Sequence, residues 1–319
     1  MTIHSRLWYL AVPGVAIVAG TVIAVRVTKN RLTDNRTVSA ALELTSHHRG
    51  GNGSPLLLLH GVGSIWRAWS PVLPYLDEHH DVIVPTLAGH GGAAALDPLH
   101  PPSINALADS IEAQLDELGI DRLHIAGNSL GGWLGIELAR RGRALSLVLF
   151  SPAGAWRSQR SIEMRSAAIG FSVGALSRYS ARADLLSTNA ALRWLMVAPQ
   201  VAYPSRFPAD ILAASIRASA MSPVVAPLLR EIIRGQVEPL PADRDYPVRL
   251  VWGNEDRVLP YAGFGEPMLR RLPGAELVRV AGFGHVPMTD DPARVARLIL
   301  DVTSIVEDNL HAEQTGSDG

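Results

Sequence analysis

Apolar residues between positions 55 and 150 gather in short runs, and longer stretches of mixed polarity separate these runs. Short apolar runs bounded by glycine, proline or polar residues predict buried strands, whereas apolar residues at helical spacing predict helices. The predicted strands cover residues 55–59, 81–85, 123–126 and 145–150. The predicted helices cover residues 103–118 and 132–141. Strands that alternate with helices in this way are typical of a parallel sheet.

The alternation stops at Ser151 and resumes after about Asp245. The intervening stretch is rich in Ala, Leu, Ile and Met, and its apolar spacing predicts helices over residues 162–169, 191–196 and 211–220. Apolar runs at residues 248–253 and 276–280 then predict the last strands. The pattern therefore predicts an α/β fold with a mostly parallel sheet, flanking helices and a helical insertion.

This pattern divides the chain into five expected parts. They are an N-terminal segment at 1–30, a first part of the core at 31–150, the helical insertion at 151–245, a second part of the core at 246–307 and a disordered polar tail at 308–319. Near the start of the core, residues 38–44 are predicted as an edge strand and residues 47–53 as a turn.

Residues 127–131 read Gly-Asn-Ser-Leu-Gly and lie between a predicted strand and a predicted helix. A serine at such a junction makes a sharp, strained turn, and flanking glycines let neighbouring backbone come close without Cβ clashes. The hydroxyl of Ser129 would then stand at a helix N-terminus, where the amide of Leu130 faces a developing oxyanion. Ser129 is a candidate nucleophile, and Leu130 is a candidate oxyanion donor.

This arrangement resembles the α/β-hydrolase family, whose catalytic residues follow the chain order nucleophile, acid, histidine. Of eleven histidines, only His285 and His311 lie far downstream of Ser129. His311 belongs to the polar tail, whereas His285 follows an apolar run on a glycine-containing loop. The resemblance implies that His285 is the general base.

The resemblance also implies an acid after the strand at 248–253. Asp256 fits the family's spacing after Gly253, and Glu255 is its nearest rival. Some relatives place the acid after the preceding core strand, but Ser151 and Pro152 stand there in this chain. We therefore predict that Asp256 orients His285.

A second oxyanion donor is expected from the loop after the strand at 55–59. His60 and Gly61 begin a His-Gly-x-Gly motif, which in the family directs the amide of the following residue, here Val62, toward the substrate carbonyl. Relatives usually have aspartate where this chain has Thr86, a departure outside the predicted catalytic residues.

Composition narrows the classes of function. The 319 residues include 47% hydrophobic residues and carry a net charge of −1, which suits one large α/β core and gives no basic face for nucleic acid. No cysteine is present, so disulfide and thiol chemistry are excluded. The histidines of the first hundred residues lack the spaced partners of a zinc site, and the predicted reaction needs no cofactor.

Residues 7–25 contain no charge and, at about 1.5 Å per residue, reach nearly the thickness of a bilayer's hydrocarbon core. We expect an uncleaved membrane anchor, because the run is longer than a usual signal-peptide core and lacks an Ala-x-Ala site. Basic residues are more numerous after the run than before it, which predicts a cytoplasmic catalytic domain. Secretion after signal cleavage is the alternative.

The predicted function is hydrolysis of a carboxylic ester, and the helical insertion and the anchor favour an apolar or lipid-like substrate. Aromatic and long apolar residues of the insertion are expected to form its own core, with an acyl pocket as the alternative: Phe171, Trp194, Met196, Tyr203 and Phe207.

Three other functions remain open. The elbow is also similar to that of meta-cleavage-product hydrolases, which cut carbon–carbon bonds, and to that of cofactor-free haloperoxidases and perhydrolases. A catalytically inactive, membrane-tethered binding protein is the third alternative. Epoxide and haloalkane chemistry is disfavoured, because those relatives use an aspartate where this chain has Ser129.

Overall fold

The computed structural model describes residues 47–97 and 101–316. The chain divides into two units, Met1–Leu42 and Glu43–Gly319, and the described residues all belong to the second. The predicted anchor at residues 7–25 and the predicted strand at residues 38–44 lie outside the described residues. Within the described ranges, no helix is both long enough and apolar enough to cross a membrane.

In the described part of the chain, seven strands form one sheet in the order β1-β3-β2-β4-β5-β6-β7. Their bounds are β1 His47–Gly50, β2 Ser54–Leu59, β3 His80–Pro85, β4 Leu123–Asn128, β5 Ala144–Phe150, β6 Val248–Gly253 and β7 Glu276–Val280. Among these seven described strands, only the edge strand β1 is antiparallel to its neighbour; the other pairs are parallel. The α/β fold predicted from the alternating pattern is confirmed.

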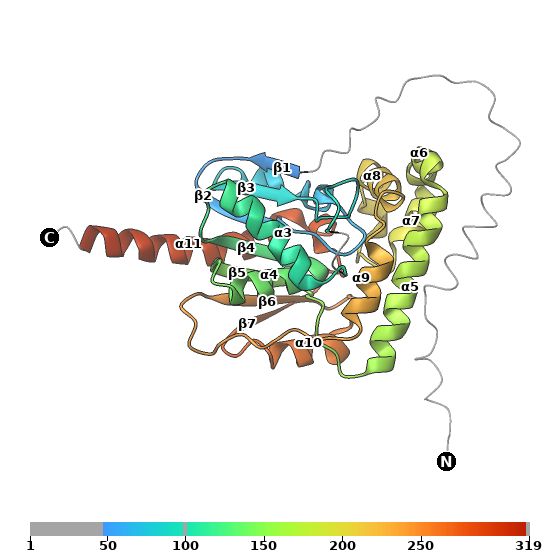
Figure 1. Ribbon diagram of the computed structural model, residues 1–319. Coiled ribbons are helices and arrows are strands. Elements are labelled where there is room, and N and C mark those ends of the chain that lie inside the picture. The colour runs from blue at the N-terminus through green and yellow to red at the C-terminus, as the bar shows by residue number, and fades with distance from the viewer. Residues whose placement is uncertain (1–46, 98–100, 317–319) are drawn as a thin grey trace, which may run out of the picture. The chain divides into compact units, whose positions relative to one another are not determined.

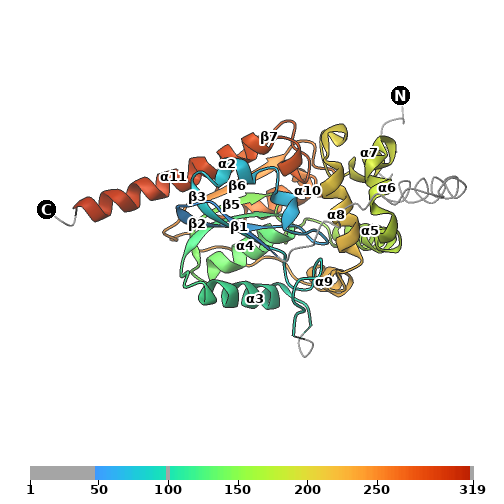
Figure 2. The same ribbon diagram turned by 90° about the horizontal axis from the view of Figure 1, so that it is seen from above.

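Helices cover both faces of the sheet (Figure 2). Leu57 and Leu59 of β2 face a core cluster shared with α3 (Ile104–Glu117), α4 (Leu130–Arg140) and α10 (Tyr261–Leu269). Leu56 and Leu58 face a second cluster shared with η2 (Trp66–Trp69), α2 (Leu73–Leu76) and α11 (Pro292–Gly316). Successive side chains of a strand point to opposite faces, so one apolar run supplies both cores.

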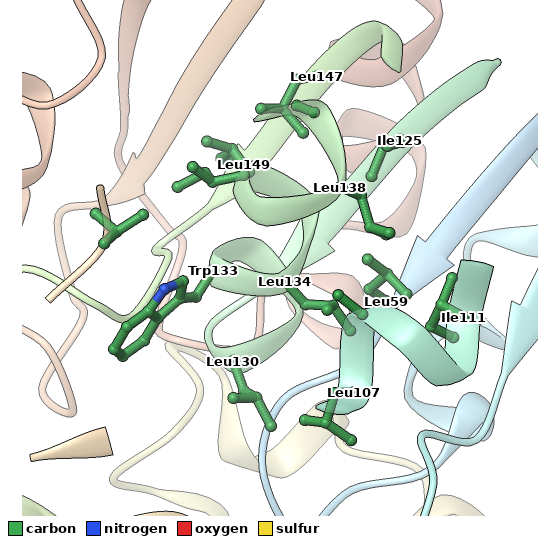
Figure 3. Packing of buried hydrophobic residues seen from close by; sticks show 14 of the residues in the cluster. Leu59, Leu107, Ile111, Ile125, Leu130, Trp133, Leu134, Leu138, Leu147 and Leu149 are labelled. Atoms are coloured by element: carbon green, nitrogen blue, oxygen red, sulfur yellow. The ribbon is translucent and has the colours of Figure 1, made fainter. Parts of the chain in front are cut away.

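Helix α4 follows the predicted nucleophile and is almost entirely buried. Leu134 and Leu138 lie between the sheet residues Leu59 and Ile125 and residues of α3 such as Ile111 (Figure 3). A close-packed interior resists displacement because each shift forfeits many van der Waals contacts. The N-terminus of α4 is therefore held firmly against the sheet.

The insertion between β5 and β6 forms a helical lid (Figure 1). Its elements are α5 (Gln159–Arg178), η3 (Ser180–Arg182), α6 (Ala183–Thr188), α7 (Ala190–Val197), η4 (Pro204–Arg206), α8 (Ala209–Ser219) and α9 (Val225–Ile232). Helix α8 packs against α5, α6 and the core turn η2, and α9 packs against α5. The lid lies over loops that follow the carboxyl ends of strands: a Cβ on Gly63, after β2, would stand 3.0 Å from Val173 of α5.

The prediction that the large apolar lid residues form the lid's own core is wrong for three of them. Phe171 is 58% exposed, Trp194 51% and Tyr203 41%. Met196 and Phe207 are half-buried. Helical spacing shows that apolar residues share a face, but it does not show which face meets α8 and α9.

Two local predictions near the ends also fail. Residues 47–50 are a strand and not a turn, because they pair with β3 and Arg49 forms an ion pair with Asp81 at 2.6 Å. The expected disordered tail is helical as far as Gly316, where α11 ends. Adding a residue to an existing helix costs little, and no proline interrupts this stretch.

Candidate active site

Ser129 occupies the sharp turn between β4 and α4, with φ 55° and ψ −114°. A non-glycine residue with positive φ is strained, and such strain persists only where surrounding structure enforces it. Glycines make the turn possible: a Cβ on Gly127 would lie 2.3 Å from the carbonyl oxygen of Gly131, and one on Gly131 would lie 2.2 Å from that of Leu59. No side chain fits at either position.

The predicted base and acid are hydrogen-bonded to each other. Nδ1 of His285 lies 2.9 Å from Oδ2 of Asp256, and both residues are buried. The other carboxylate oxygen, Oδ1, accepts the amides of Val258 at 2.9 Å and Leu259 at 2.7 Å. These bonds orient the carboxylate toward the imidazole.

Glu255, the rival acid, points elsewhere. Its Oε2 accepts the amide of Gly282 at 2.8 Å, in the turn after β7. Of the two carboxylates on this loop, Asp256 alone is bonded to the imidazole in the part of the chain that the structure describes.

Asn128 connects the serine turn to the histidine loop. Its side-chain amide donates to the carbonyl of His285 at 2.8 Å and to that of Phe150 at 3.0 Å. Within the described residues, no hydrogen bond is made by the Ser129 hydroxyl or by Nε2 of His285. The ring nitrogen opposite Asp256 is thus open to exchange a proton, and hydrogen bonds between catalytic groups often tighten only when substrate is bound.

The loop that carries Val62 lies beside the serine, since a Cβ on Gly61 would be 3.4 Å from Cβ of Ser129. The amides of Val62 and Leu130 have no acceptor among residues 47–97 and 101–316. For Leu130 this follows from its place in the first turn of α4, where helix amides lack an intrahelical partner. Two free amide donors therefore flank the serine.

His60 supports this loop, a role that the sequence did not indicate. Its Nε2 accepts the amide of Leu87 at 2.9 Å, so Nδ1 carries the proton and donates to the carbonyl of Gly61 at 2.8 Å. Burial, followed by the neighbouring His90, lowers the pKa of His60 to about 3. The imidazole is therefore neutral near pH 7 and ties the end of β2 to the loop after β3.

The described residues contain no group of three or more His, Cys, Asp or Glu side chains that could hold a metal ion. Sequence reasoning missed Asn128 and His60 as supports of the site. Both stand within the motifs that it recognised, but their hydrogen-bond partners are distant in the chain.

A family model described as the alpha/beta hydrolase family matches residues 56–298. This match spans more than half of the 319 residues. Together with the seven-stranded sheet and the serine turn, it shows that the chain belongs to the α/β-hydrolase family. The resemblance inferred from residues 127–131 is confirmed.

Among similar proteins, the epoxide hydrolase EphH of Mycobacterium tuberculosis is 35% identical over 216 residues, covering 63% of this chain and 94% of the relative. The pimeloyl-[acyl-carrier protein] methyl ester esterase of Aromatoleum aromaticum is 31% identical over 266 residues, covering 79% of this chain and 98% of the relative. A solved thermophilic esterase from Thermogutta terrifontis has the same fold, with a TM-score of 0.63 at 22% identity, covering 82% of this chain and 93% of that chain.

Proposed function

We propose that this hydrolase cleaves carboxylic esters of apolar or lipid-like substrates through an acyl-enzyme. Oγ of Ser129 attacks the ester carbonyl, and His285 accepts its proton at Nε2 and passes it to the departing alcohol as the C–O bond breaks. Water then attacks the acyl carbon, again with His285 as base, and releases the acid. The amides of Val62 and Leu130 bind the oxyanion.

The observation that carries this proposal is the hydrogen-bonded pair of His285 and Asp256, which leaves Nε2 of the imidazole without a partner in the described residues. The backbone of His285 is bonded to Asn128, the residue directly before the strained Ser129. A carboxylate that accepts from Nδ1 holds the tautomer in which Nε2 can take a proton. The relative named as a methyl ester esterase supports the same reaction.

Epoxide hydrolysis is a second candidate, because a relative at 35% identity carries that name. The chemistry of Ser129 argues against it. Attack by a carboxylate on an epoxide leaves an ester that water can hydrolyse, whereas attack by a serine hydroxyl would leave an ether with no carbonyl to attack. An enzyme with Ser129 as nucleophile would stop after one turnover.

Carbon–carbon cleavage would be favoured by an arginine facing a carboxylated substrate. Arg165 of α5 contacts the acid loop and Arg257 belongs to it, and both guanidinium groups donate to backbone carbonyls. Arg165 binds the carbonyl of Arg257 at 2.9 Å and also that of Val258, whereas Arg257 binds the carbonyl of Ala198 at 2.9 Å. Because both guanidinium groups already bind backbone carbonyls, they are not free to bind a substrate carboxylate, which favours an ester over a ring-fission product as substrate.

A substrate panel tests the proposal. The protein is assayed with p-nitrophenyl esters of increasing chain length, an aryl epoxide, a ring-fission product, and acetate with peroxide, beside Ser129→Ala as the blank. We expect multiple turnovers with esters only. A fluorophosphonate probe should bind covalently to Ser129, and mass spectrometry should locate it there. Turnover of the epoxide or ring-fission product, with none on esters, would contradict the proposal.

The N-terminal segment carries a separate proposal, that residues 7–25 anchor the chain in a membrane with the hydrolase domain on the cytoplasmic side. Support comes from the uncharged apolar run and the basic residues that follow it. Full-length protein should stay in the membrane fraction through a carbonate wash. An intact mass that lacks the first two dozen residues would instead indicate a cleaved signal.

A further inference from the structure

Asp290 is a buried carboxylate outside the proposed reaction. It follows η5 (Pro287–Thr289), five residues after His285, and is 4% exposed. Its Oδ2 accepts the amide of Gly284 at 2.8 Å, and its Oδ1 accepts the amides of Ala202 at 2.9 Å and Tyr203 at 3.0 Å. One side chain thus binds both the loop of the proposed base and a segment of the lid.

The lid segment Ala198–Tyr203 touches the same loop directly. The carbonyl of Gln200 accepts the amides of His285 at 2.7 Å and Val286 at 2.9 Å. A Cβ on Gly284 would lie 2.7 Å from Cα of Val201, so the two backbones are packed without room for a side chain. The position of the His285 backbone therefore depends on this lid segment.

A buried carboxylate is costly unless it is hydrogen-bonded. Burial raises the pKa of Asp290, and the amides of Gly284, Tyr203 and Ala202 act in the opposite direction. Charge-assisted bonds to backbone amides are stronger than neutral ones. Asp290 is therefore well suited to hold the loop of His285 to lid amides that lie 87 and 88 residues from it in sequence.

We infer that Asp290 is a positioning residue for the proposed reaction: it holds the lid segment Ala198–Tyr203 and the loop of His285 in one register. Within the described residues its carboxylate forms no hydrogen bond with the imidazole, and it acts through the backbone at Gly284. Loss of its acceptors leaves buried amides unpaired and lets the loop shift. A displacement of about 1 Å at a reacting group can cost roughly 100-fold in rate. The inference rests on the proposed role of His285.

The test compares Asp290→Asn with Asp291→Asn in the full chain. Asp291 is the adjacent carboxylate and caps α11 by accepting the amide of Arg294 at 3.0 Å; within the described residues it has no hydrogen bond to the lid segment. For a short p-nitrophenyl ester, we expect Asp290→Asn to lower kcat by roughly 10- to 100-fold with KM changed less than about threefold. Asp291→Asn should leave both constants near wild type.

A second readout does not depend on ester turnover. The Nδ1 proton of His285, held by Asp256, should give a downfield NMR resonance that moves or exchanges faster in Asp290→Asn but not in Asp291→Asn.

A wild-type kcat and an unmoved resonance in Asp290→Asn, or equal losses in both variants, would overturn the inference. If Asp290→Asn does not fold, Asp290→Glu replaces it, and the same two readouts decide. If the wild type hydrolyses none of the esters, only the proposed function is contradicted. The NMR resonance would still test whether Asp290 positions the loop of His285.

Discussion

Buried histidines lie near acidic side chains at both ends of the sheet, and the two sites differ in what the ring nitrogens bind. At the carboxyl ends of the strands, His285 is bonded to Asp256 through Nδ1. At the amino ends, His80 begins β3 and His124 lies in β4, and both approach Glu307 of α11. We call His80, His124 and Glu307, with the hydroxyls that bind them, the amino-end cluster.

In the amino-end cluster, the imidazole of His80 has partners at both nitrogens. Nδ1 lies 2.9 Å from Oγ of Ser54, and Nε2 lies 2.9 Å from Oγ1 of Thr303. Nδ1 of His124 lies 2.8 Å from Oγ of Ser146, and burial lowers its pKa to about 4. These rings are neutral near pH 7 and link the sheet to α11.

The comparison shows that residue types alone do not make a catalytic group. Ser54, His80 and Glu307 are a serine, a histidine and an acid in contact, yet the serine hydroxyl bonds both to the imidazole and to the carboxylate. At the other end, Asp256 binds Nδ1 of His285, and Nε2 of the same ring has no partner in the described residues. The strained Ser129 belongs to that end of the sheet. We therefore expect chemistry at one end and stability at the other.

The largest expected effect comes from removing the proposed nucleophile or base. Ser129→Ala, His285→Ala and the double variant should each lose roughly 10⁶-fold in kcat, because residues that act as a unit do not lose activity additively. Ester hydrolysis and fluorophosphonate labelling measure this. Additive losses in the double variant would show that the two residues act independently, and the comparison between the two ends would fail.

The second effect concerns the carboxylate that holds the imidazole. Asp256→Asn should fold normally but lower kcat by about 10⁴, the loss typical of this change in a serine-protease triad, because the wrong tautomer is favoured. Glu255→Gln is the matched control, since its carboxylate binds the amide of Gly282. Circular dichroism checks the fold of both, and a crippled Glu255→Gln beside an active Asp256→Asn would reverse the assignment.

The third effect is on the pH dependence of stability. The folded pKa of His124 is about 4, below its ordinary value of 6.5, so the unfolded chain binds more protons between these pH values. Stability should therefore be full above pH 6.5 and fall toward pH 4, at up to about 1.4 kcal/mol per pH unit for this group.

Urea unfolding between pH 4 and pH 6.5 measures how the free energy of unfolding depends on pH. His124→Asn should reduce this slope by an amount that corresponds to up to one proton. The exposed His79, replaced by Asn, is the control and should keep the wild-type slope. An unchanged slope in His124→Asn would show that this histidine does not link protons to folding.

The smallest effect comes from the serine of the amino-end cluster. Ser54→Ala removes a hydroxyl that bonds both His80 and Glu307, and it should lower the free energy of unfolding by roughly 1–2 kcal/mol, since each hydrogen bond usually contributes about 1 kcal/mol. Ester turnover should be unchanged. A loss of activity without loss of stability would mean that the amino-end cluster takes part in catalysis.

Much of the core was predictable from local patterns. The strands at 248–253 and 276–280 have the predicted bounds. The run at 248–253 is largely buried, and a short apolar run between turn residues has few other ways to be buried. The helix after Ser103 begins where its hydroxyl accepts the amide of Ala106. The serine turn was also local, since Gly127 and Gly131 are required by contacts within a few residues or with the adjacent strand.

Other features required the tertiary structure. Whether residues 47–50 form a turn or a strand depended on β3, whose residues lie more than thirty positions away. The exposure of Phe171 and Trp194 depended on which faces of α5 and α7 pack against neighbouring elements.

The sequence by itself determined the α/β fold, the serine turn and the order of its candidate partners, because strand burial and strained turns leave short-range signatures. The structure agrees with the family's spacing that Asp256 and not Glu255 meets the imidazole. Only the tertiary structure decided that Asp290 joins the lid to the base loop and that both ring nitrogens of His80 are bonded. Hydrogen bonds between side chains depend on direction and distance in space, and sequence spacing does not encode either across separate strands.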